Sequence, residues 1–476
     1  MQFSTFEYFS FLATAVAVYW LFGRFLPRAG RVAMLVLASL VFYGWSAPQC
    51  LLFLILSIVI NYPIAAQLRK RRGQRGLTAF AVVLNCLPLL FFKYTNFILG
   101  VASSAVGLCG GSWTWAPMKL VLPLGISYVT FVQIAYVVDA SRGSPSVSFL
   151  DYALHVSFWP KLISGPIVRQ REIVPQLNKQ KFGRLCALRW CVGLTVFMIG
   201  LAKKLLLADP LGGVADWGWG AGTVNCASAW LTTACYTLQL YFDFSGYCDM
   251  AWGSAIFFNI KLPINFRSPY KADSIQDFWR RWHISLSLWL RDYLYFSFGG
   301  SRCALPKTIR NVFLTFLIGG IWHGAGWTFI IWGALHGLAL SICNLWRKLQ
   351  PRRLPRPIGW LLTILFVHFA WIFFRAPDAA AACRMIGAMF APAATGAKSF
   401  DWTFSQSYFF YAMALVSVLV LFARNTYQMT VFLLLRTRSV KWQILSGGYA
   451  AFLLFCCILR MCARNVPQSP FLYFQF

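Results

Sequence analysis

Long apolar runs recur along the whole chain, and they constrain its fold more than any single motif does. Several of them approach or exceed the roughly 18–20 residues that a helix needs to cross a bilayer. Hydrophobic residues make up 59% of the 476 residues. Because a lipid-facing segment must satisfy its own backbone hydrogen bonds, such runs form helices. We therefore predict an all-α, polytopic membrane protein with about eleven or twelve transmembrane helices and no soluble domain.

Basic residues greatly outnumber acidic ones, and most of them stand at the ends of the apolar runs. The chain has 43 Lys and Arg against 13 Asp and Glu, a formal net charge of +30. In a soluble protein this excess would suggest nucleic acid binding, but clusters at span ends are typical of cytoplasmic loops. With the clusters at 24–31 and 69–75 inside, the N-terminus lies outside. The partners that we expect are membrane lipids, not nucleic acid.

The order of the runs divides the chain into three parts. Residues 1–138 hold the N-terminal helices, 139–346 a core, and 347–476 the C-terminal helices. In the core, His155 to Arg169 is too broken by proline and glycine for a clean span, and we interpret it as a re-entrant or interfacial element. The 14 cysteines show no metal-like spacing, so no metal site is predicted.

One long amphipathic helix is predicted after Asp273. Ser274, followed by Asp277 three residues on, is an N-cap signal, and Gly299-Gly300 ends the run. At 100° per residue the tryptophans share one face, and a narrow polar stripe occupies the other. This helix should lie on the cytoplasmic face of the membrane. The polar stripe holds Gln276, Arg280, His283, Ser287 and Arg291.

The next segment is apolar on all sides and contains His323 at an Ile-Trp-His-Gly-Ala-Gly break. His323 follows Arg310 by 13 residues, about 20 Å of helix, which places it near or past the midplane of the bilayer. An ionisable residue there is a functional candidate, although a structural histidine bonded to a carbonyl would fit the pattern equally well. Asp243 and Asp249 also lie at depth, and they could pair with basic residues purely for packing.

Several longer motifs occur in a fixed order. They are PLGISYVTF, FWPKLISGPIVR, YFDFSGYCDMA, LPINFRSPY, FWRRWHISLSLWLRDYLY, WHGAGWTFIIWGALHG and the tail PFLYFQF. Together they cover nearly the whole chain. In this combination the sequence resembles the membrane-bound O-acyltransferase family, and within it the alginate O-acetyltransferase branch.

The resemblance implies helices arranged around a central membrane tunnel. It makes His323, in its Trp-His-Gly setting, the essential histidine and His283 the second characteristic one. We assign His323 the role of general base and His283 a place on the donor side, and no bound cofactor is expected. Candidate substrate-binding residues are Trp322, Arg280, Asp243 and Asp249.

The resemblance also implies a reaction and a location. Acetyl would pass from a cytoplasmic donor, acetyl-CoA, to a periplasmic acetyltransferase partner or to a secreted polysaccharide such as alginate or cellulose. The protein would be a multi-pass protein of the bacterial inner membrane, with both termini in the periplasm.

Two other functions stay open at this point. A D-alanyl transferase for teichoic acid, fed by an acyl-carrier protein, is the main rival within the enzyme class. A solute transporter or polysaccharide export channel is the rival outside it. A transporter would favour paired intramembrane charges in repeated halves, and no internal repeat is visible in the sequence.

The predicted sidedness can be tested by labelling single cysteines, introduced into a chain without its native cysteines, with a membrane-impermeant maleimide. Cysteines placed in 69–76 and 261–310 should react only from the cytoplasm, and those in 110–115 only from the periplasm. Labelling of Arg71→Cys from the periplasm alone would invert the topology.

Overall fold

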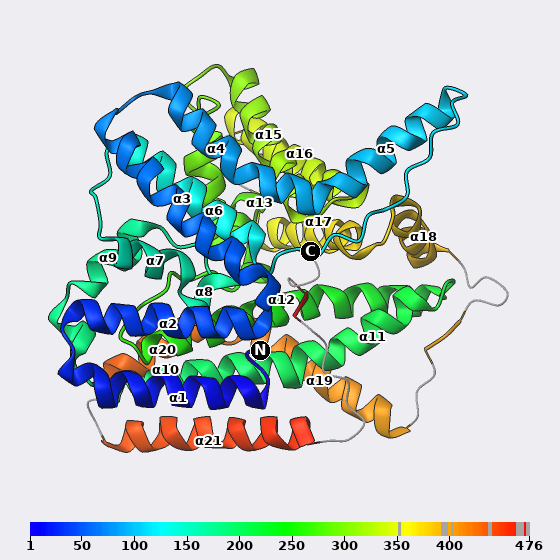
Figure 1. Cartoon of the computed structure of the whole chain (residues 1–476). Helices are drawn as coiled ribbons and strands as arrows, with labels where there is room; N and C mark the ends of the chain where they lie inside the picture. Colours follow the sequence, from blue (N-terminus) through cyan, green and yellow to red (C-terminus); the bar gives the residue numbers. More distant parts are fainter. Residues whose placement is uncertain (351–353, 392–397, 401–403, 437–439, 463–470, 473–476) are drawn as a thin grey trace.

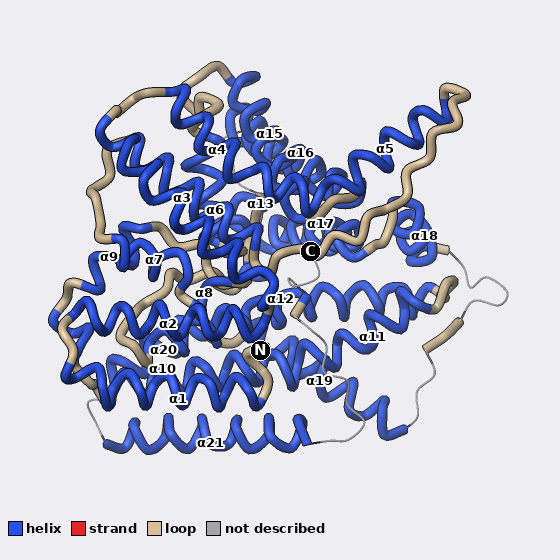
Figure 2. Tube along the Cα trace, in the orientation of Figure 1, coloured by secondary structure: helices blue, strands red, loops and turns tan. Residues whose placement is uncertain are grey.

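The computed structural model describes residues 1–350, 354–391, 398–400, 404–436, 440–462 and 471–472. Arg352, Arg353 and most of the tail motif PFLYFQF lie outside these ranges. The described residues form helices joined by loops, and apart from one isolated bridge between Val224 and Lys398 they contain no β pairing (Figure 2). The predicted all-α class is confirmed.

The N-terminal part is a set of long helices, joined in places by short 3₁₀ turns. A π-helical segment, η3, links α4 to α5, so that the three form one continuous apolar run from Arg75 to Leu108 (Figure 1). The elements are α1 (Phe6–Phe22), α2 (Arg28–Ser46), α3 (Leu51–Lys70), α4 (Arg75–Leu89), η3 (Leu90–Tyr94) and α5 (Thr95–Leu108).

The core part alternates long and short helices, and two further π-helical segments, η5 and η7, interrupt it. Its helices are α6 (Ile126–Ser141), α7 (Phe149–Ser157), α8 (Trp159–Leu162), α9 (Gln170–Leu177), α10 (Ala187–Ala202), η5 (Lys203–Ala208), α11 (Asp209–Gly220), α12 (Cys226–Ile256), α13 (Ile275–Arg281), α14 (Ile284–Trp289), η7 (Leu290–Tyr295), α15 (Leu305–His323) and α16 (Trp327–Leu349). The C-terminal part holds α17 (Arg356–Arg375), α18 (Ala379–Phe390), α19 (Phe404–Phe422), α20 (Thr426–Arg436) and α21 (Val440–Cys462).

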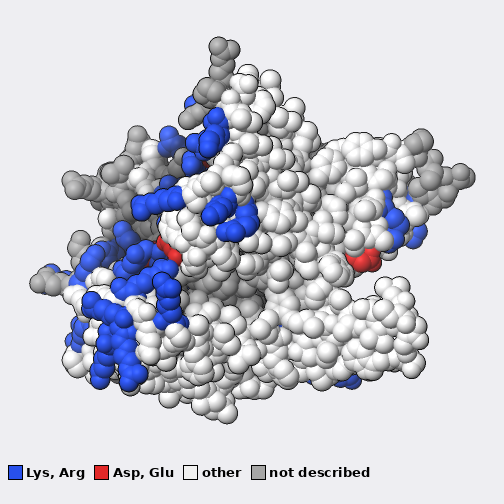
Figure 3. Space-filling view, turned by 90° about the horizontal axis from the view of Figure 1, so that it is seen from above, with Lys and Arg blue, Asp and Glu red and all other residues white. Residues whose placement is uncertain are grey.

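Among the described residues, eight helical runs are long and apolar enough to cross a membrane, fewer than the eleven or twelve expected. Some expected spans are short, and others, such as α12 with 31 residues and α15 with 19, are long enough but too polar to be counted. The helix α6, for example, is apolar but has only 16 residues. The chain is nonetheless a multi-pass membrane protein. Most of the Lys and Arg side chains visible in Figure 3 gather toward one end of the molecule, as the clusters at span ends predict.

The stretch from His155 to Arg169 is broken, as its prolines predict. It forms the end of α7, the four-residue helix α8 and a loop, and every residue in it is buried. Non-helical backbone at membrane depth is tolerated only where protein or a water-filled cavity surrounds it. Burial within the protein therefore agrees with the re-entrant interpretation.

The long amphipathic helix predicted after Asp273 is wrong. The chain starts a helix at Ile275 with the Ser274 cap as predicted, since Ser274 Oγ accepts from the N–H of Asp277. It then breaks at Trp282 and His283, restarts as α14, and continues into η7. His283 has φ +42°, in the left-handed region. The polar stripe therefore does not exist as a straight line.

The helices α15 and α16 form an antiparallel hairpin in contact along its length. Gly320 and Gly333 face each other: a Cβ added to Gly320 would stand 2.4 Å from the carbonyl oxygen of Phe329 and 2.7 Å from Cα of Gly333. No side chain fits at that separation, so the two glycines permit the close approach. This contact holds the last turn of α15 close against α16.

Candidate active site

His323 is the last residue of α15, and its ring is enclosed by aromatic side chains. Ring centroids of Trp322, Trp332 and Phe374 lie 4.8, 5.0 and 5.2 Å from that of His323. The residue is only 5% exposed. After it the backbone is extended at Gly324 and Gly326, and α16 begins at Trp327. The predicted burial of His323 at a glycine-rich break is confirmed.

His283 lies in the break between α13 and α14, and the side chain of Asn265 holds that break in place. Asn265 Oδ1 accepts from the N–H of Ser285 at 3.0 Å and from Ser285 Oγ at 2.8 Å, and it lies 3.3 Å from Nδ1 of His283. The His283 ring also meets Phe244 edge-on at 4.8 Å. His283 is fully buried, so the predicted place on an interfacial stripe is wrong.

The structure brings the two histidines into one neighbourhood. His283, Lys93 and His336 lie close enough to His323 for a charge on any of them to act on its ring. The three neighbours come from α16, η3 and the turn before α14. Together with α15 itself, four segments thus meet at His323.

Trp322 forms part of the wall of an apolar cavity of about 990 Å³. Its ring stacks on Phe131 at 4.6 Å, and Phe131 stacks on Trp289 at 3.8 Å, which makes one continuous aromatic wall. The indole N–H of Trp322 has no hydrogen-bond partner among the described residues. Residues that line the cavity include Arg75, Cys86, Tyr94, Ile134, Arg142, Tyr293, Leu294 and Ile318.

A second cavity, of about 810 Å³, is more polar than the first and is lined by four arginines. It shares Arg142 and Tyr293 with the apolar one, so the two adjoin. Its lining residues are Asp139, Arg142, Gly143, Ser144, Pro145, Ser146, Val147, Arg169, Gln170, Arg171, Val174, Pro175, Asn178, Arg291, Asp292, Tyr293 and Phe296.

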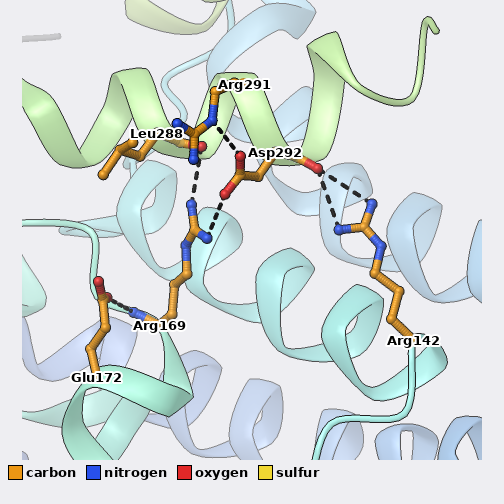
Figure 4. A network of polar contacts seen from close by, with 6 residues as sticks. All are labelled: Arg142, Arg169, Glu172, Leu288, Arg291 and Asp292. Carbon is orange, nitrogen blue, oxygen red and sulfur yellow. Dashed lines mark hydrogen bonds and ion pairs between the residues drawn. The ribbon is translucent and has the colours of Figure 1, made fainter. Parts of the chain in front are cut away.

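Asp292 organises the arginines of this basic cavity (Figure 4). Its carboxylate pairs with Arg169 and with Arg291, each at 2.6 Å, and its backbone carbonyl accepts from both Nη atoms of Arg142 at 3.3 Å. Burial raises the pKa of Asp292, but the hydrogen bonds and the positive charges of Arg291 and Arg169 together outweigh burial and lower that pKa below its usual value. The carboxylate therefore stays charged and holds the guanidinium groups in place.

Asp243 and Asp249 belong to a buried ion cluster. Lys204 Nζ lies 2.7 Å from Asp243 and 2.8 Å from Asp209, while Lys203 Nζ lies 2.7 Å from Asp249. Two further donors complete the cluster: Asp243 accepts from the N–H of Leu472, and Asp249 accepts from the hydroxyl of Thr426. Both aspartates are paired with lysines, and their substrate-binding role stays a prediction.

One further sequence candidate, Arg280, and two further buried histidines make other contacts. Arg280 is exposed, and no ion pair or hydrogen bond of the described residues involves its side chain. His336 accepts from the indole N–H of Trp279, and His368 shares a hydrogen bond with Thr237, so both are bonded inside the fold. No group of three or more His, Cys, Asp or Glu among the described residues could hold a metal ion.

Two residues near the site were missed from the sequence. Asn265 stands within the LPINFRSPY motif, but nothing in that motif indicates a contact with His283. Lys93 was visible only as a lone charge inside an apolar run, and a charge at membrane depth is a signal in its own right.

Comparison with known proteins fits this arrangement. The model of the membrane-bound O-acyltransferase family matches residues 128–386, a range that contains both site histidines. The chain belongs to the membrane-bound O-acyltransferase family. It is thus an O-acyltransferase, and Lys93 lies outside the part that the family model matches.

The chain is similar to relatives with three different named activities. The chain is 44% identical to the peptidoglycan O-acetyltransferase of Helicobacter pylori, over 75% of this chain and 73% of that protein. It is 37% identical to a probable alginate O-acetylase of Pseudomonas putida, over 98% of both. The teichoic acid D-alanyltransferase of Bacillus subtilis is 30% identical, over 64% of this chain and 79% of that protein.

The ion cluster gives the first structure-based prediction. Asp243→Asn should lower the free energy of unfolding of the purified protein by about 3–5 kcal/mol at most. The buried ammonium group of Lys204 would lose one of its two carboxylate partners. Thermal unfolding in detergent measures the change. The matched control is Asp216→Asn. The Asp216 side chain is 58% exposed, so losing its ion pair with Arg375 should lower the free energy of unfolding by about 1 kcal/mol or less. Unchanged stability together with a raised KM for the donor would show that Asp243 contributes to substrate binding and not to stability.

Proposed function

We propose that this O-acyltransferase moves an acetyl group from cytoplasmic acetyl-CoA across the bacterial inner membrane, for O-acetylation of a secreted polysaccharide. The observation that carries the proposal is the pair of adjoining cavities. One is basic, and the other is apolar and ends at Trp322, whose ring lies against His323. A donor with a charged head and a narrow reactive arm fits such a path.

The charge of the basic cavity supports a phosphorylated donor. Four arginines line it against two aspartates, and one of these, Asp292, is already engaged with Arg169 and Arg291. Arg142 and Arg171 are exposed, and Arg171 makes no ion pair with any described residue. Guanidinium groups bind phosphate oxygens in a planar, bidentate geometry. The phosphates of coenzyme A would therefore be held there, with the thioester arm in the apolar cavity.

The chemistry proposed at His323 needs no metal. A neutral imidazole takes the proton of the acceptor hydroxyl as its oxygen attacks the thioester carbonyl carbon. The tetrahedral intermediate collapses, the carbon–sulfur bond breaks, and the proton passes from the imidazole to the departing thiolate. The indole N–H of Trp322, which has no partner among the described residues, would donate to the oxyanion. His283, held by Asn265, would orient the donor or His323 itself.

The acceptor side rests on the relatives. One is named a peptidoglycan O-acetyltransferase and another a probable alginate O-acetylase, and they match most of this chain. A polysaccharide hydroxyl, or a periplasmic acetyltransferase that passes the acetyl on, is the acceptor that we propose. Both termini would then face the periplasm, with the basic end of the molecule in the cytoplasm. D-alanyl transfer from a carrier protein is the second candidate, supported by the Bacillus subtilis relative.

The catalytic role of His323 can be tested in cells and in vesicles. His323→Ala should abolish O-acetylation of the exported polysaccharide while the protein accumulates normally in the membrane, because a general base is lost and no buried ion pair is broken. Ester-bound acetate per unit of polysaccharide is the measurement. His368→Gln, at a buried histidine outside the site, is the control and should keep its activity. Full acetylation by His323→Ala would remove His323 from the mechanism.

The donor site can be tested separately in inverted membrane vesicles, which expose the cytoplasmic face. The double variant Arg142→Gln/Arg171→Gln should raise the KM for radiolabelled acetyl-CoA by roughly two- to thirtyfold, because each exposed ionic contact contributes about 0.2–1 kcal/mol. Turnover at saturation should change little. Arg24→Gln, an exposed arginine outside both cavities, is the control. An unchanged KM would exclude this cavity, and transfer only from a D-alanyl carrier would favour the second candidate.

A further inference from the structure

The end of α15 leaves backbone carbonyl groups without helical partners at the point where the active-site histidine stands. The last four carbonyls of any α-helix lack an intrahelical N–H. Here Lys93 Nζ donates to the carbonyl oxygens of Trp322 and His323, at 2.8 Å each, and the Tyr94 hydroxyl donates to that of Ile321. Three consecutive carbonyls are thus bound by two adjacent residues.

These two residues form the end of η3, the π-helical segment between α4 and α5. Extra residues in a π turn change the direction in which side chains project, and such turns occur frequently at functional sites. Tyr94 is buried, with 6% of its surface exposed. We call Lys93 and Tyr94 together the α15 clamp.

The charge of Lys93 suits its position. The carbonyl end of a helix carries a partial negative charge, and a cation there is stabilising. An ammonium group at membrane depth is otherwise expensive. Among the described residues, Lys93 makes no ion pair with a carboxylate, and both of its hydrogen bonds go to the end of α15. The interactions of Lys93 therefore serve to bind the carbonyl end of α15.

We propose that Lys93 is a positioning residue of the active site. The clamp fixes the C-terminal end of α15, and with it the backbone of His323 and the direction of its ring. Lys93 acts without contact to the substrate, since it lines neither cavity. The Gly324–Gly326 junction makes such a support necessary, because its extended backbone gives His323 no helical continuation. The inference rests on the proposed function only in that His323 is the base.

The kinetic test uses inverted vesicles and radiolabelled acetyl-CoA. Lys93→Met removes the charge and both hydrogen bonds, and kcat should fall by about 10- to 100-fold, as expected for a misplaced catalytic group, with the KM for acetyl-CoA unchanged. Lys93→Arg keeps the charge and the donors and should restore most of the turnover. Lys307→Met, an exposed lysine at the other end of α15, is the matched control and should keep the wild-type kcat.

Two results would overturn the proposal. One is wild-type kcat in folded Lys93→Met, and the other is an equal loss in the Met and Arg variants. Should Lys93→Met fail to fold, Tyr94→Phe removes only the bond to Ile321, and its kcat should fall with KM unchanged. A wild-type kcat in that variant would then count against the clamp. Wild-type vesicles without acetyl transfer would refute the proposed function instead.

A second measurement needs no donor. In hydrogen–deuterium exchange of the purified full chain, a peptide covering residues 318–328 should take up deuterium faster in Lys93→Met than in the wild type or in Lys307→Met, because the helix end is no longer held. Equal uptake in all three proteins would show that Lys93 does not hold α15, whatever the donor is.

Discussion

A carbonyl group inside a membrane must find a donor within the protein, and the end of α15 depends on this requirement. The helix stops at His323, so the carbonyl groups of Ile321, Trp322 and His323 have no partner within the helix. Lys93 and Tyr94 supply the donors from a different part of the chain. The helix end that holds the proposed base is thus built from two segments separated by more than two hundred residues, and neither is complete without the other.

The same requirement explains the second polar region. Lys203 and Lys204 follow one another in η5, and each projects toward an aspartate of α12. A buried lysine without a carboxylate would be far more costly than the pair. The cluster therefore joins η5, α12 and, through Leu472, a residue near the end of the chain. These charged pairs stand in one cluster, unlike the repeated halves expected of a transporter.

Sequence reasoning succeeded where local pattern decides the structure. Apolar run length predicted the helical membrane class, and the glycines around His323 predicted its break and burial. It failed where a distant side chain decides the structure. The periodicity after Asp273 was helical throughout, yet Asn265 accepts two hydrogen bonds from Ser285 and turns the chain at His283. Lys93 was equally hidden, because its partners are backbone carbonyls, which every residue carries. The proposed catalytic roles remain predictions, since placement alone does not test them.

The left-handed backbone of His283 has an evolutionary consequence. A residue other than glycine pays about 1–2 kcal/mol for this conformation, and asparagine and aspartate tolerate it best after glycine. Two requirements therefore limit which residue can stand at position 283. One is the imidazole ring, and the other is the φ angle of +42°. Lineages that dispense with the imidazole should drift first to asparagine or glycine, and β-branched residues should be the last to appear there.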